Sequence, residues 1–87
     1  MIMRYKLYDT EDKKLYIGVE SHYFKLTDAK DSYRESKTQD GKTDDSILFE
    51  IAREGEEGIQ GTFTFGVEDG EKFALALLNL CYKIKGF

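Results

Sequence analysis

Few residues in this chain of 87 have side chains that could support catalysis or metal binding. His22 is the single histidine and Cys81 the single cysteine, which excludes a structural zinc site with four Cys or His ligands. Cys81 lies among apolar residues, where a thiol usually behaves as a small hydrophobic group. Acidic pairs occur only in turn-forming segments, where water equalises their pKa values. We therefore predict no catalytic residue, no cofactor and no metal; an enzyme would need a pocket that gathers His22 with distant carboxylates.

Charge is distributed unevenly along the chain, whose formal net charge is −4. Residues 40–71 carry ten acidic and two basic residues, a net charge of −8, whereas residues 72–87 carry three lysines and no acid. An acidic segment of this kind repels nucleic acid and anionic membranes and attracts a basic protein surface. A solvated loop and strand face is the alternative interpretation. If the segment binds a protein, the predicted contact residues are Asp44, Asp45, Glu54, Glu56 and Glu57.

A second surface combines basic and aromatic side chains on the outward face of a predicted hairpin. Its members are Arg4, Lys6, Tyr8, Lys14 and Tyr16. Interleaved side chains of these types can stack bases and neutralise phosphates. They can equally form cross-strand pairs that stabilise an exposed sheet face. Glu20 shares the face and the chain is acidic, so binding of single-stranded nucleic acid is our alternative prediction.

The elements that must position these residues follow from hydrophobic periodicity. Residues 2–8 and 14–20 alternate apolar and polar types, which is typical of a hairpin with one aliphatic face. Residues 47–54 and 59–67 alternate in the same way around a connection with a glycine at each end, and predict a second hairpin. Residues 22–26 suggest a short additional strand. Residues 27–34 fit either a capped helical turn or an irregular edge, and residues 36–45 fit a mobile loop.

Residues 70–85 predict a C-terminal helix, with Asp69 as the N-cap and Gly86 just past the last turn. Its apolar residues form one continuous stripe at Phe73, Leu77, Leu80, Cys81 and Ile84, widened by Ala74, Leu75, Leu78 and Tyr82. A helix on one sheet needs an apolar stripe of roughly 100°. This stripe is wider. Either the sheet curls around the helix, which we favour, or a second copy or a partner covers the excess.

Together these patterns predict one small α+β domain over residues 1–87, an antiparallel sheet of four to five strands (two hairpins) curled on a C-terminal helix. A single cysteine, the lack of a signal-like apolar run and the lack of a long apolar segment predict a cytoplasmic protein without a membrane span. The leading functional prediction is a non-enzymatic binding protein that acts through protein–protein contacts, as an adaptor, an inhibitor or a homodimeric module.

Overall fold

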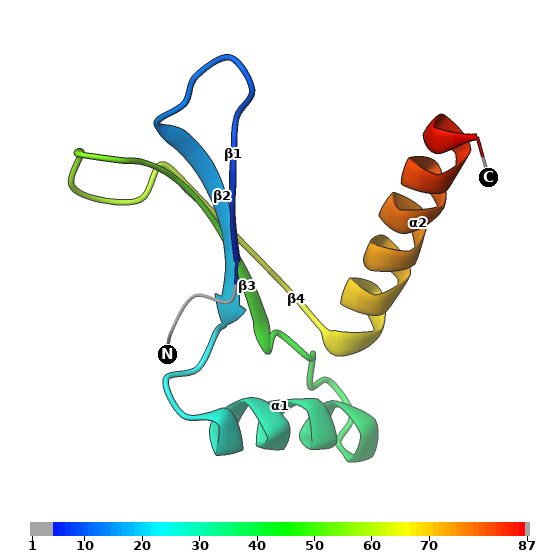
Figure 1. Cartoon of the computed structure of the whole chain (residues 1–87). Coiled ribbons are helices and arrows are strands. Elements are labelled where there is room, and N and C mark those ends of the chain that lie inside the picture. The colour runs from blue at the N-terminus through cyan, green and yellow to red at the C-terminus, as the bar shows by residue number, and fades with distance from the viewer. Residues whose placement is uncertain (1–4, 87) are drawn as a thin grey trace.

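The computed structural model describes residues 5–86 and confirms the α+β fold. Four strands form one antiparallel sheet in sequence order: β1 (Tyr5–Tyr8), β2 (Leu15–Ser21), β3 (Ile47–Arg53) and β4 (Gly61–Phe65). A helix, α1 (Leu26–Thr38), connects β2 to β3, and a longer helix, α2 (Val67–Lys85), follows β4. Figure 1 shows α1 lying across one end of the sheet and α2 leaning away from it.

The strand registers place most of the large apolar residues of the four strands on one face of the sheet, whereas Leu48 and Ala52 lie on the other face. Leu7, Ile17 and Ile51 lie opposite one another on adjacent strands, as do Val19, Phe49 and Phe63. We call this the apolar sheet face; it consists of Tyr5, Leu7, Leu15, Ile17, Val19, Ile47, Phe49, Ile51, Phe63 and Phe65. Both predicted hairpins are thus confirmed, with the predicted inward residues on one side.

Helix α1 confirms the helical alternative for residues 27–34 and is longer at both ends than predicted. The predicted strand at 22–26 is wrong, because Leu26 already begins α1, and residues 36–38 are helical rather than part of the loop. The connection to β3 starts at Gln39, whose backbone N–H donates to the Glu35 carbonyl at the helix end. Spacing explains the helix: Leu26, Ala29 and Tyr33 recur at helical intervals and all three line a cavity against the sheet.

Helix α2 begins three residues earlier than predicted, with Gly66 rather than Asp69 as its N-cap residue. Gly66 has no side chain that could accept a hydrogen bond from the helix N-terminus. The carboxylate of Asp44, in the loop before β3, accepts this hydrogen bond instead. The Val67 N–H donates to Asp44 Oδ2 at 2.8 Å, and the Ser46 N–H donates to Asp44 Oδ1 at 3.0 Å. At the other end Gly86 adopts φ of 94°, the predicted left-handed cap.

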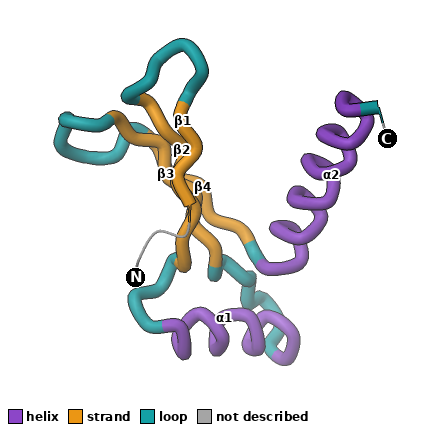
Figure 2. The backbone as a smooth tube through the Cα atoms, viewed as in Figure 1, coloured by secondary structure: helices purple, strands orange, loops and turns teal. Residues whose placement is uncertain are grey.

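The packed interior is small. The buried residues among 5–86, glycines aside, are Ala29, Ser46 and Ala52, and no large side chain there is fully buried. The sheet does not curl around α2, and no described residue of α2 is buried. The backbone in Figure 2 shows the resulting open shape, in which α2 and the sheet diverge from a common base near α1.

The overall dimensions agree with this open shape. The radius of gyration is 15.2 Å, whereas a compact chain of this length has about 12 Å. The chain exposes 6934 Å², whereas a compact 10.1 kDa protein exposes about 5,300 Å². The excess of about 1,600 Å² per chain is about twice the area of roughly 800 Å² that one partner buries in a standard protein interface.

Candidate functional site

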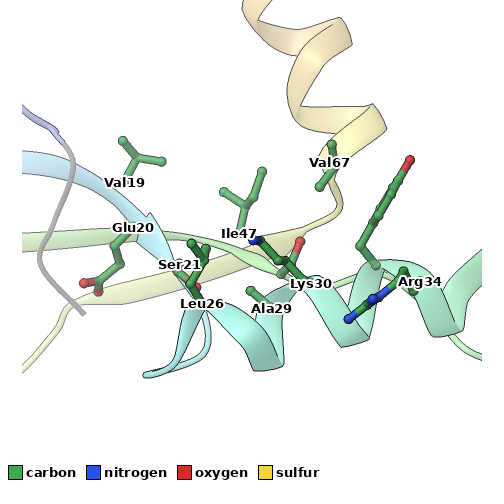
Figure 3. A pocket seen from close by; sticks show the side chains of 11 residues that line it. Val19, Glu20, Ser21, Leu26, Ala29, Lys30, Arg34, Ile47 and Val67 are labelled. Atoms are coloured by element: carbon green, nitrogen blue, oxygen red, sulfur yellow. The ribbon is translucent and has the colours of Figure 1, made fainter.

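The space between the sheet and the two helices is an apolar cleft. Its deepest part is a cavity of about 550 Å³ where the ends of β2 and β3 meet α1 and the first residue of α2. Figure 3 shows Val19 and Ile47 from the sheet, Leu26 and Ala29 from α1, and Val67 from α2 around this space. We define the apolar cleft as this cavity together with the apolar sheet face and α2.

Both walls of the apolar cleft expose large side chains. On the sheet, Phe63 is 67% exposed and Leu7 58% exposed. On α2, the exposed large residues are Phe73, Leu75, Leu77, Leu78, Leu80, Tyr82 and Ile84. An exposed apolar surface this extensive is rare on a monomeric protein and marks an interaction site. The favoured prediction that the sheet curls around α2 is therefore wrong, and the alternative, cover by a second copy or a partner, stays a prediction.

Contacts at the base of α2 set its direction. The Phe49 ring meets Phe65 edge-on at 4.9 Å between centroids and Phe73 at 6.1 Å. A Cβ placed on Gly70 would lie 3.0 Å from Phe65 and 3.1 Å from Ile47, so the first turn of α2 packs closely on the sheet. Lys37 of α1 also forms an ion pair with Glu68. We call these contacts, with Asp44, the α2 clamp.

The buried hydroxyl of Ser46 adds a polar feature to the cavity. Ser46 is 5% exposed and lines the cavity, and its Oγ has no hydrogen-bond partner within the part of the chain that the structure describes. An unpaired buried hydroxyl is costly, so it favours a bound group that can pair with it. Sequence analysis missed Ser46, and a lone serine before a strand carries no signal that would identify it.

Three of the predicted residues of the first hairpin, Lys6, Tyr8 and Tyr16, lie together on one face, and Arg4 lies outside the described residues. Tyr8 faces Tyr16 at 5.5 Å between rings, and Lys6 Nζ lies 4.6 Å above the Tyr16 ring. Lys14 precedes β2 at the turn. Glu54 joins the group and accepts hydrogen bonds from the Tyr8 hydroxyl at 2.6 Å and from Lys6 Nζ at 3.4 Å.

Glu54 changes the electrostatics of this surface. The Tyr8 hydroxyl, followed by Lys6, lowers the pKa of Glu54, so the carboxylate stays ionised and offsets the lysine charge. Glu54 in turn raises the pKa of Lys6 and of Tyr8. A phosphate would have to compete with Glu54 for Lys6. The arrangement thus favours the alternative of stabilising cross-strand pairs.

The predicted acidic contact residues do not form one surface. Asp44 and Asp45 precede β3, whereas Glu54, Glu56 and Glu57 follow it, and the strand separates the two groups by about 23 Å. Asp44 accepts the hydrogen bond from the first N–H of α2 and so belongs to the α2 clamp. Asp45 accepts hydrogen bonds from the Tyr23 hydroxyl at 2.6 Å and from Ser32 Oγ at 3.1 Å. Glu56 and Glu57 are exposed on the β3–β4 loop. Their role in binding stays a prediction.

His22 does lie beside a carboxylate. Its Nδ1 is 2.9 Å from the Asp45 carbonyl oxygen and 3.4 Å from Asp45 Oδ2. Ser32, however, donates to Asp45 and not to His22, so the histidine activates no hydroxyl in this arrangement. The hydrogen bond from Tyr23 lowers the Asp45 pKa, and each of these contacts ties the loop before β3 to α1 or to the end of β2.

Among residues 5–86, no group of three or more His, Cys, Asp or Glu side chains is arranged to hold a metal ion. Neither described helix combines the length and apolar character needed to cross a membrane.

Two carboxylates lie side by side on the sheet face opposite the apolar one. A hydrogen bond with Glu20, followed by burial, raises the Glu50 pKa. Because the pKa of Glu50 is higher in the folded chain than in the unfolded chain, the ionised carboxylate destabilises the fold. This loss of stability is absent below the unfolded pKa near 4.5 and grows as the pH rises above it.

We expect Glu50→Gln to raise the unfolding temperature at pH 7 and to leave it nearly unchanged at pH 4. Glutamine keeps the shape and removes the charge next to Glu20. Thermal unfolding followed by circular dichroism at the two pH values measures the difference. Glu57→Gln, in the exposed loop, is the control, and an equal effect of the two substitutions at pH 7 would contradict the interpretation.

Comparison with known proteins identifies no relative: no protein-family model, no curated protein and no solved structure matches this chain significantly.

Proposed function

We propose that this chain is a non-enzymatic protein-interaction module and that the apolar cleft is its binding surface. The observation that carries the proposal is the excess exposed surface of about 1,600 Å² per chain over a compact protein of the same mass. At about 25 cal/mol per Å², leaving even half of this area exposed as apolar surface would cost on the order of 20 kcal/mol. Few domains of this size can tolerate such a cost without a partner.

The position of the surface supports the same proposal. The cleft residues come from all four strands and both helices, and the α2 clamp holds the cleft open rather than letting the helix close on its own sheet. The exposed glutamates of the β3–β4 loop would then contribute a charged rim, where charge acts on association rate and specificity more than on affinity.

Position-specific photo-crosslinking in cells tests the proposal. With benzoylphenylalanine at Leu78, on the apolar side of α2, we expect protein adducts after irradiation. The matched control places the same amino acid at Ala76, on the narrow polar edge of α2 formed by Lys72, Ala76, Asn79 and Lys83, and should give at most weak adducts. Equal labelling from both positions, or no adduct from Leu78, would contradict the proposal.

A further inference from the structure

We infer that the occupant of the apolar cleft is a second copy of this chain, with the α2 helix of each copy lying in the cleft of the other. The inference rests on the proposed function and deepens it by identifying the partner. Three features of the described residues favour a second copy: the area to be covered, the presence of both complementary surfaces on one chain, and the rigid start of α2.

The area fits an obligate pair. If each copy buries its excess of about 1,600 Å², the pair buries about 3,200 Å², within the range of about 2,000–5,000 Å² for obligate homodimers. A peptide helix could fill the cleft, but it would leave the outer side of α2, with Leu75 and Leu78, exposed. A second copy fills the cleft and also supplies a cleft that receives α2.

The chain carries both halves of one interface. The apolar sheet face lacks a covering helix, and α2 lacks a covering sheet. A two-fold symmetric pair satisfies both surfaces at once, because each contact of the first copy is repeated by the second. The lengths also agree: α2 spans about 28 Å and β3 about 23 Å.

The breadth of the α2 stripe supports this arrangement. Phe73, Leu77 and Leu80 lie on the side that faces the chain's own sheet at the clamp, and Leu75 and Leu78 lie about 140–160° around the helix from Phe73, on nearly the opposite side. The cleft of another copy provides a sheet face and a helix at an angle to each other. It can therefore cover two sides of an inserted helix, which a single flat sheet cannot.

Closure of α2 on its own sheet is the competing arrangement. It would require α2 to rotate about its first turn, where Val67 N–H is bonded to Asp44 and Gly70 packs on Phe65 and Ile47. A Cβ on Gly66 would lie 2.8–2.9 Å from Asp44, so the backbone there has little free space. Exchange between two copies leaves this clamp intact.

The first experiment measures mass in solution with the full chain. Sedimentation equilibrium is expected to give twice the 10.1 kDa chain mass. Leu77→Asp should raise the dissociation constant by more than about 100-fold, because each dimer would contain two desolvated charges. Ala76→Asp, the same charge on the adjacent polar edge, should leave the dimer intact. A wild-type chain that is monomeric up to the highest soluble concentration would overturn the inference.

The second experiment establishes exchange. The variant Asn79→Cys/Cys81→Ala is prepared without isotope label and carries a nitroxide at residue 79. It is mixed with ¹⁵N-labelled wild-type chain, and the two are unfolded and refolded together. Amide signals of β2, β3 and β4 in the ¹⁵N-labelled copy are expected to broaden, since the label and the observed sheet are on different molecules. A dimer whose sheet signals stay sharp would overturn the exchange of α2.

These outcomes separate the inference from the function on which it rests. A monomeric purified chain whose Leu78 position still crosslinks to a different protein in cells would remove the second copy as occupant and keep the interaction module. A dimer with no dependence on Leu77 or Leu78 would remove the apolar cleft as the binding surface, and with it both proposals.

Discussion

Phe49→Ala is expected to lower the free energy of unfolding by about 3 kcal/mol. This is the low end of the range of about 3–5 kcal/mol for Phe→Ala substitutions, because Phe49 is only half-buried. Its ring is the contact that joins β3 to both β4 and α2, through Phe65 and Phe73. Removing it should loosen the base of α2 as well as the sheet. Urea unfolding followed by far-ultraviolet circular dichroism, at a fixed protein concentration, measures the change.

Phe24→Ala provides the matched control for Phe49→Ala. Phe24 is 81% exposed, so the same atoms are removed where they contribute little packing. We expect a change of less than about 0.5 kcal/mol, as for most surface substitutions. Equal losses for the two variants would contradict the assignment of Phe49 as the centre of the packing between the sheet and α2.

Gly66→Ala is expected to cost about 1–2 kcal/mol, the typical value of a lost helix N-cap. The backbone of Gly66, at φ −94° and ψ 175°, suits any residue, so the cost is not one of backbone strain. The added methyl would meet Asp44 at 2.8–2.9 Å and push its carboxylate away from the Val67 N–H. Urea unfolding measures the loss, and Asp44→Ala should show a similar one.

A double-mutant cycle tests the cause of the Gly66→Ala effect. If both substitutions act by removing the same cap, the Asp44→Ala/Gly66→Ala chain should lose little more than either single variant. Gly61→Ala is the steric control, because a Cβ there meets only Ile51 Cδ1, at 4.0 Å. Fully additive losses would show that Gly66 and Asp44 act independently, contrary to the geometry.

Hydrophobic periodicity alone predicted both hairpins and the C-terminal helix. Alternation over 14–20 and 47–54 determines which side chains share a face, since a strand repeats every two residues. The sequence did not decide between a helical turn and an irregular edge for residues 27–34, because the apolar residues of α1 are sparse: Leu26, Ala29 and Tyr33 lie among ten polar positions. The helical spacing of these three residues was the available signal for α1. The signal is weak because Ala29 is small and Tyr33 carries a polar hydroxyl, so neither is strongly apolar.

The candidate site, like the fold, was only partly predictable from the sequence. The width of the apolar stripe on α2 was visible in the sequence and indicated that one sheet is insufficient to cover it. The cavity with Ser46 and Val67, and the pairing of Glu54 with Tyr8 and Lys6, depend on residues that are far apart in the chain. Local patterns do not identify such contacts.

The sequence by itself determined the elements, the order of polar and apolar faces, and the separation of acidic and basic charge, because each depends on neighbours a few residues apart. Only the tertiary structure decided the direction of α2. That direction depends on Asp44 reaching Gly66 and Val67, and on Phe49 meeting Phe73, contacts between residues more than twenty positions apart. The same long-range contacts leave the sheet and the helix apolar and uncovered, and so create the cleft from which the function is proposed.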